Sequence, residues 1–201
     1  MRARMAPDVR RELIVDATLA VMLRKGLAAT TVRDVALETG ISPGLVHHYF
    51  ASMDELLATA FSRAAGQGLD QTRAAMAAVE EPVEKLRAFF STYTRAEQDW
   101  AFQLWLDAWA EASRRPVLRA TSYRLNVAWQ QLLVGVVELG VAAGVFGCTD
   151  PEGAAWRILS LLDGLALQTV AHQVAVDRES VVAWSARLAE DELTLPHGTL
   201  T

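Results

Sequence analysis

Helix caps and turn residues follow one another closely in a segment near the N-terminus, TVRDVALETGISPGLVHHYF. Thr31 followed three residues later by Asp34 is typical of a helix start, where each side chain binds the backbone N–H group of the other residue. Gly40 predicts the end of that helix, because glycine readily adopts the left-handed conformation of a C-cap. Ser42 predicts a second N-cap, with Pro43 at the first helical position, where a missing N–H group costs nothing. The segment therefore predicts two short helices joined by a tight turn.

The second short helix has an apolar arc and a polar arc. At about 100° per residue, Val46 and Phe50 fall within one arc, and Gly44, His47 and His48 fall within the opposite arc. Two short helices joined by a glycine turn form a helix-turn-helix, whose second helix enters the major groove of DNA. We therefore expect the first arc to be buried and the second to face DNA.

The adjacent residues His47 and His48 allow three interpretations. Imidazole can donate to guanine or phosphate acceptors, which favours contact with DNA. A solvated surface pair is the second interpretation, and a metal site is the third. Adjacent helical residues diverge by about 100°, so they do not easily bind one ion together. The other two histidines, His172 and His197, are distant in sequence, and we expect no metal.

The charge of the chain is unevenly distributed. The net charge is −5 over 201 residues. Residues 1–53 contain seven basic and five acidic residues, so this segment carries +2 and the remainder −7. A basic end on an acidic protein indicates that this end meets a polyanion.

Composition also indicates a cellular compartment. Cys148 is the only cysteine, which excludes an internal disulfide and fits a reducing cytosol. The N-terminus is polar, without a signal peptide. The most apolar stretch, 132–146, contains Glu138 and is too short to span a bilayer. We expect a soluble, cytoplasmic protein that does not enter a membrane.

From about residue 9 to 60, the chain resembles the DNA-binding segment of the TetR-type transcriptional repressors. The resemblance rests on TTVRDVALETGISPGLVHHYFASMDELL, in which the caps, the glycine turn, the Tyr-Phe pair and Asp-Glu-Leu-Leu occur in order. The family often has Tyr at the position of His47, and usually has Lys, a phosphate contact, at that of Met53. The resemblance implies a double-stranded DNA operator as partner. The predicted DNA-contacting residues are Thr31, Arg33, Ser42, Pro43, Gly44, His47, His48 and Tyr49.

The rest of the chain has helical periodicity and no alternating strand pattern, which predicts an all-α fold of about nine helices. We expect residues 1–53 to form a three-helix domain containing the helix-turn-helix, and 54–201 to form a ligand-binding and dimerisation domain. A helix over 53–79 would connect them. The tail from 193 onwards is expected to be frayed. Further helices are expected over 9–25, 83–98, 100–113, 116–144, 152–175 and 178–193.

Aromatic residues gather in the second half. Phe102, Trp105 and Trp109 lie near one helix face, and Trp129 follows on the next helix. These rings are either core or the lining of a ligand cavity between helices. On the same helix, Asp107 and Glu111 could help an aromatic box hold a cation, although a solvated acidic edge is favoured.

Polar residues interrupt a later helix. Gln168 and His172 either point into the same cavity or form a satisfied hydrogen bond at an interface. The predicted ligand pocket therefore contains Phe102, Trp105, Trp109, Trp129, Gln168 and His172.

The stretch WRILSLLDGLALQTVAHQV is apolar nearly all round, which predicts a helix buried on several sides. A subunit interface provides such burial, so helices 152–175 and 178–193 of two chains are expected to form a four-helix bundle in a homodimer. Over about 83–175, the chain also resembles the regulatory domain of BetI-type repressors, in WLDAWAEA, the GVFG..DPEGAA turn and LLDGLALQ. That resemblance implies a homodimeric repressor released by a small molecule. The namesake of the subgroup responds to choline, and its relatives respond to varied ligands.

Three functions are compared. The leading one is a ligand-responsive homodimeric repressor that binds a palindromic operator. The second is a DNA-binding regulator without an effector, in which the aromatic residues are only core. The third is a helical enzyme, because GISPG matches the Gly-x-Ser-x-Gly pattern with Ser42 at its centre. That pattern requires a preceding strand, whereas a helix is expected here, so we expect neither an enzyme nor a cofactor.

Overall fold

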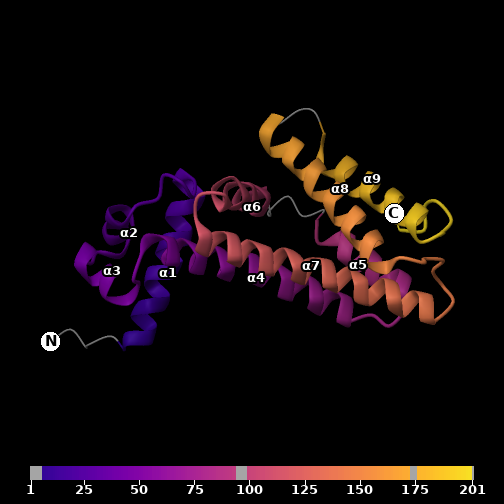
Figure 1. Ribbon diagram of the computed structural model, residues 1–201, viewed down its shortest axis with the longest axis horizontal. Coiled ribbons are helices and arrows are strands. Elements are labelled where there is room, and N and C mark those ends of the chain that lie inside the picture. The colour runs from indigo at the N-terminus through magenta and orange to yellow at the C-terminus, as the bar shows by residue number, and fades with distance from the viewer. Residues whose placement is uncertain (1–5, 94–98, 173–175, 201) are drawn as a thin grey trace. The chain divides into compact units, whose positions relative to one another are not determined.

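The computed structural model describes residues 6–93, 99–172 and 176–200, and every regular element in these ranges is an α-helix (Figure 1). The predicted all-α fold is confirmed. The helices are α1 (Pro7–Lys25), α2 (Val32–Thr39), α3 (Pro43–Tyr49), α4 (Met53–Ala77), α5 (Pro82–Ser91), α6 (Asp99–Ala112), α7 (Pro116–Ala142), α8 (Pro151–His172) and α9 (Arg178–Glu192).

One predicted helix is too long. The helix expected over 83–98 ends at Ser91. The hydroxyls of Ser91 and Thr92 donate to the carbonyls of Ala88 and Phe89, at 2.8 and 2.7 Å. Such local bonds compete with continuation of a helix. Residues 94–98, and residues 173–175 at the end of the helix predicted over 152–175, lie outside the described part.

The chain divides into two compact units. The first unit comprises residues 1–66 and 104–124, and the second comprises residues 67–103 and 125–201. Helices α4, α6 and α7 each continue from one unit into the other. The domains expected over residues 1–53 and 54–201 stay a prediction.

The predicted caps of the helix-turn-helix are all present in the first unit. The hydroxyl of Thr31 accepts from the N–H group of Asp34 at 3.3 Å, and the carboxylate of Asp34 accepts from the N–H group of Thr31 at 3.0 Å. Gly40 has φ of 66°, in the left-handed region. The hydroxyl of Ser42 accepts from the N–H group of Leu45 at 3.3 Å. Short-range bonds of this kind fix where α2 and α3 begin and end.

The core of the second unit is formed by α5, α7, α8 and α9. Leu86 and Phe89 of α5 are fully buried, as are Leu133 of α7 and Ile158 of α8. Helices α8 and α9 pack along each other (Figure 1). The apolar helix α7 is long enough to cross a membrane by length and composition. Its buried residues are equally typical of the core helix of a soluble protein.

The C-terminal tail is ordered, which corrects the prediction of a frayed end. Leu193 and Leu200 are buried. The buried carboxylate of Glu190 accepts from the backbone N–H groups of Gly198 and Leu200, at 3.1 and 2.7 Å. Two charge-assisted bonds and a buried leucine hold the tail down. The spacing of apolar residues carries no sign that Glu190 would turn inward.

Candidate DNA interface and regulatory site

The helix α3 presents two different faces. Val46 and Phe50, which follow the apolar arc, have only 1% and 2% of their surface exposed. Gly44, His47 and His48 are exposed. The predicted orientation of the helix is therefore confirmed, whereas contact with DNA stays a prediction. Because Val46 and Phe50 are buried against the rest of the first unit, α3 can offer only its opposite arc to a partner.

Tyr49 lies at the rim between these faces. It is half-buried, and its ring meets the ring of His48 edge-on at 5.3 Å between centroids. This contact restricts the rotamers of His48. Among the described residues, no group of three or more His, Cys, Asp or Glu side chains could hold a metal ion.

Two predicted contacts have hydroxyls that also serve as caps. The hydroxyl of Thr31 accepts from the N–H group of Asp34 and donates to the carboxylate of Asp34 at 2.6 Å. Its hydrogen is therefore engaged. The hydroxyl of Ser42 accepts from Leu45, and its own hydrogen has no acceptor among the described residues, so it can donate to a phosphate. Pro43, the first residue of α3, is exposed beside Ser42.

Several basic side chains of the first unit are paired with acids. Arg24 binds Glu38 through both guanidinium nitrogens, at 2.5 and 3.3 Å. Lys25 binds Asp34 at 2.6 Å. The hydrogen bond from Lys25, followed by those from Thr31, lowers the pKa of Asp34 to about 2. These cations are less available to a phosphate backbone.

Other arginines of the first unit have no acidic partner among the described residues, and Arg10 and Arg33 are two of them. Arg33 is exposed and Arg10 half-buried, and neither has an acidic partner among the described residues. Sequence analysis selected Arg33 but missed Arg10. Local spacing gives no signal for Arg10, because Arg24 and Lys25 also have no acidic residue three or four positions away and are paired with Glu38 and Asp34 of α2. The guanidinium groups of Arg10 and Arg33 can therefore serve as phosphate contacts.

A second group of residues forms an aromatic cluster in the second unit. Tyr93 lies at its centre, stacked on Phe102 at 6.2 Å and tilted against Trp129 at 6.0 Å and Phe89 at 5.3 Å. We call these four residues the Tyr93 cluster. The indole nitrogen Nε1 of Trp129 is buried and has no hydrogen-bond partner. An unpaired buried donor is costly, which makes the cluster suited to an added acceptor.

Charged groups lie beside the Tyr93 cluster. Burial raises the pKa of Asp163 to about 7. The pKa of Tyr93 is raised by burial first and by the charge of Asp163 second. The guanidinium of Arg178 lies 5.0 Å from the centre of the Phe102 ring and donates to the carbonyl of Tyr93 at 2.8 Å. Burial lowers the pKa of Arg178. A cation thus already contacts one ring of the cluster.

The six predicted pocket residues are divided between the two units. Phe102 and Trp129 belong to the Tyr93 cluster. Trp105 and Trp109 lie in the first unit, where Trp105 meets Phe61 edge-on at 5.0 Å. Seven residues of helix span about 10 Å, which separates Trp109 from Phe102 despite their common face. A ligand pocket lined by these rings stays a prediction.

The remaining two predicted pocket residues lie on α8. Gln168 is half-buried, and His172 is exposed at the C-terminal end of the helix. No ring contact or hydrogen bond joins either residue to the Tyr93 cluster in the described ranges. A role of Gln168 and His172 in a ligand pocket stays a prediction.

The acidic pair on α6 is not a solvated edge. Asp107 accepts a hydrogen bond from the backbone of Leu27. The side chain of Glu111 is 13% exposed and binds Arg115 at 2.9 Å, and this bond is the main reason why the pKa of Glu111 is lowered. The preference for solvated carboxylates is wrong because Asp107 accepts from the backbone of Leu27, far away in sequence, and Glu111 is bound by Arg115, four residues along the chain.

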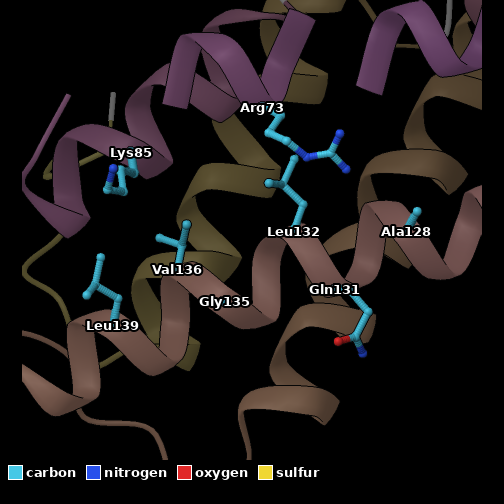
Figure 2. A pocket seen from close by; sticks show the side chains of 8 residues that line it. All are labelled: Arg73, Lys85, Ala128, Gln131, Leu132, Gly135, Val136 and Leu139. Carbon is cyan, nitrogen blue, oxygen red and sulfur yellow. The ribbon is translucent and has the colours of Figure 1, made fainter. Parts of the chain in front are cut away.

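An open groove of about 490 Å³ runs along α7 in the second unit. Figure 2 shows its lining, which is mostly apolar with Arg73 and Lys85 at the α4 and α5 side. Lys85 donates to the carbonyls of Met76 and Val79, at 2.9 and 2.6 Å, and so caps the end of α4. Arg73 is paired with Asp70 at 2.7 Å. None of the predicted pocket residues lines this groove.

Two protein-family models match the chain. The one described as bacterial regulatory proteins, tetR family, matches residues 14–60. The one described as BetI-type transcriptional repressor, C-terminal, matches residues 82–194. The chain is 32% identical over 177 residues to the HTH-type transcriptional regulator BetI of Rhizobium meliloti strain 1021, covering 87% of this chain and 85% of the relative.

Solved structures show the same fold. A transcriptional regulator from Pseudomonas aeruginosa PAO1 has a TM-score of 0.81 at 26% identity, covering 99% of this chain and 97% of that one. A regulator from Saccharomonospora viridis, solved in complex with choline, has a TM-score of 0.82 at 22% identity, covering 91% and 96%.

The fold and these matches together define a bacterial transcriptional regulator with a helix-turn-helix. The chain belongs to the TetR family, with a BetI-type C-terminal domain. Its relatives are named as regulators of transcription rather than as enzymes. A helix, α2, precedes Ser42, so the GISPG pattern lacks the strand that a hydrolase nucleophile requires.

Proposed function

We propose that the protein is a homodimeric transcriptional repressor that binds a palindromic operator through α3 and is released by a small-molecule effector. The observation that carries the proposal is the division of α3 into a buried arc, Val46 and Phe50, and an exposed arc with His47 and His48. Imidazole donors reach guanine acceptors in the major groove. Arg10, Arg33 and Ser42 supply donors for the phosphate backbone. Such a protein acts in the cytoplasm, where bacterial DNA is found.

An exposed apolar surface on α8 and α9 supports the homodimer. Trp184 of α9 is 52% exposed, and Trp156 and Leu167 of α8 are also exposed. Ser160 and Gly164 lie on the same α8 face, at helical spacing between Trp156 and Leu167. Large exposed apolar side chains beside small residues favour close packing with a second copy. The interface would therefore be a four-helix bundle of α8 and α9 from both chains.

The Tyr93 cluster supports an organic cation as the effector. Aromatic rings attract cations, and the ionised carboxylate of Asp163 would add an opposite charge nearby. The choline complex of the Saccharomonospora viridis regulator is consistent with this chemistry. Effector binding would favour a dimer whose two α3 helices no longer match a spacing of about 34–36 Å, so operator affinity falls by linkage.

Selection of random duplex DNA by the purified protein tests the DNA-binding proposal. We expect a palindromic sequence to be enriched, and a dimer to bind it in a gel-shift titration. If no sequence is enriched at low salt, the proposal fails.

A regulator without an effector remains the second candidate. A thermal-shift series with choline and larger quaternary ammonium ions separates the two, because a true effector raises the melting temperature.

A further inference from the structure

The guanidinium of Arg178 holds the place of a cation in the Tyr93 cluster. Its central carbon lies 5.0 Å from the centre of the Phe102 ring, and it donates a hydrogen bond of 2.8 Å to the backbone carbonyl of Tyr93. Ring faces attract organic cations, and a carbonyl oxygen accepts from the N–H groups of a guanidinium. All three residues belong to the second unit. The chain therefore supplies its own cation at the rings where the proposed effector would bind.

This placement is unfavourable for the charge of Arg178 itself. The residue is half-buried, and burial lowers the pKa of its guanidinium, because a charge that leaves water loses solvation. The Phe102 ring and the Tyr93 carbonyl offset part of this loss. A long arginine side chain can return its charged end to water by rotation alone. An incoming cation that makes the same contacts can therefore displace the guanidinium, which regains its solvation.

The start of α9 does not depend on the guanidinium. The carboxylate of Asp177 accepts from the N–H group of Ser180 at 2.7 Å and so caps the helix. Val181, three residues after Arg178, has 0% of its surface exposed. The cap and the buried valine fix the backbone at this end of the helix. The side chain of Arg178 can therefore leave Phe102 without unwinding α9.

Two polar groups at the Tyr93 cluster are not satisfied by Arg178. Nε1 of Trp129 is a buried donor without a partner, and a guanidinium, which only donates, cannot satisfy it. Burial is the cause of the raised pKa of Asp163, whereas a guanidinium paired with this carboxyl group would lower its pKa. The cation position is thus filled, while an N–H donor and a carboxyl group are left for a ligand.

We propose that Arg178 is a tethered stand-in for the effector, and that the ligand is a small organic cation that displaces the guanidinium from Phe102 and carries an oxygen that accepts from Nε1 of Trp129. This inference rests on the proposed function, because it takes the Tyr93 cluster as the effector site. Only molecules in which Arg178 has left Phe102 are competent to bind. The apparent affinity of the wild type for cations is therefore reduced by the fraction of such molecules.

Chemical rescue with methylguanidinium tests whether this space is a cation site. Arg178→Ala vacates the space of the guanidinium, so we expect methylguanidinium to bind the variant in isothermal titration calorimetry and to raise its melting temperature. The wild type should bind the ion at least about tenfold more weakly, because its own guanidinium competes. Methylurea, a neutral molecule of similar shape, should bind neither protein. Absence of methylguanidinium binding to Arg178→Ala, or equal binding to both proteins, would overturn the proposal.

Arg87 of α5 provides a matched control in the same unit. Its Nε also donates to a backbone carbonyl, that of Thr199, at 2.7 Å, but no aromatic ring faces its guanidinium in the described part of the chain. Arg87→Ala should therefore bind methylguanidinium no better than the wild type. Equal binding by Arg87→Ala and Arg178→Ala would show that any vacated arginine position takes up the ion, which contradicts a specific site at Phe102.

A milder substitution tests the competition if Arg178→Ala does not fold. Arg178→Gln keeps a donor for the carbonyl of Tyr93 and removes the charge from the Phe102 ring. We expect choline to bind this variant at least about tenfold more tightly than the wild type. Arg178→Lys keeps a cation and should bind choline like the wild type. Equal choline binding by Arg178→Gln and the wild type, including no binding to either, would contradict displacement.

These measurements use no DNA, so failure of the inference is distinguishable from failure of the proposed function. If methylguanidinium binds Arg178→Ala and the protein enriches no DNA sequence, Arg178 occupies a cation site and the proposed function fails. If a palindrome is enriched and methylguanidinium does not bind Arg178→Ala, operator binding stands and the inference is overturned.

Discussion

The two units differ in how their internal polar groups are satisfied. In the first unit, the carboxylates of Asp34, Glu55 and Asp107 each accept from a backbone N–H group. In the second unit, Nε1 of Trp129 has no partner, and burial raises the pKa of Asp163. Unpaired buried groups cost stability. Glu190 shows that carboxylates of the second unit also accept from backbone N–H groups, so the difference lies in the unpaired buried atoms, Nε1 of Trp129 and Oγ of Ser185, which both belong to the second unit.

This difference suits a regulator. DNA recognition requires that α3 be presented rigidly, because base contacts depend on fixed donor positions. Effector binding benefits from groups that gain a partner only when the ligand arrives. Binding sites with such unpaired groups commonly reduce the stability of the protein without ligand.

The largest expected effect concerns Asp163. Its pKa is raised from 3.8 to about 7 in the folded protein, so the folded state holds a proton that the unfolded state has lost. The contribution of protonated Asp163 to the free energy of unfolding is full below about pH 4. It is lost as the pH rises to about 7, and the loss is at most about 4 kcal/mol. Urea unfolding of wild type and Asp163→Asn across this range measures the difference. If the free energy of unfolding depends on pH in the same way for the wild type and Asp163→Asn, the contrast between the units is contradicted.

The next effect concerns Trp129. Trp129→Phe removes the unpaired N–H group and keeps a ring beside Tyr93 and Phe89. Relief of the unpaired donor offsets the lost contacts, so we expect the free energy of unfolding to stay within about 1 kcal/mol of the wild type, although truncation of buried Trp to Ala usually costs about 3–5 kcal/mol. Urea unfolding checks this. A loss of unfolding free energy above about 3 kcal/mol would mean that the indole N–H group donates a stabilising hydrogen bond in the protein without ligand.

The caps of the first unit predict a smaller loss. Thr31→Ala removes the hydroxyl that caps α2 and should lower the free energy of unfolding by about 1 kcal/mol. Thr39→Ala on the same helix is the matched control, because its hydroxyl donates only to the carbonyls of Val35 and Ala36 within the helix. Chemical denaturation compares the two. Equal losses would argue against a special role of the cap.

Paired and unpaired arginines should differ in salt dependence rather than in stability. Arg33→Gln removes a cation without an acidic partner and should reduce the slope of log affinity against log salt by about 0.9. Arg24→Gln removes a cation already paired with Glu38 and should leave the slope nearly unchanged. Titrations of operator DNA at several salt concentrations decide this. A similar reduction for both would show that the ion pair opens on DNA.

Local features of the fold were predictable from sequence. The caps at Thr31, Gly40 and Ser42 involve residues at most five apart, so their spacing is visible in the chain. The inward turn of Glu190 and the bond from Leu27 to Asp107 depend on residues brought together by packing. Periodicity gives the face of a helix but not the neighbour it meets. The caps and the exposed arc of α3 were therefore readable from the sequence, and these long-range contacts were not.

Binding of selected DNA by the double variant His47→Ala/His48→Ala tests the central claim, that the exposed arc of α3 reads DNA. The double variant and the wild-type protein should show the same melting temperature and the same dimer mass, because neither histidine is buried. We expect the preference for selected over scrambled duplex to fall at least about tenfold, while binding to the scrambled duplex is retained. An unchanged preference in the folded variant would contradict the assignment of this arc to the operator.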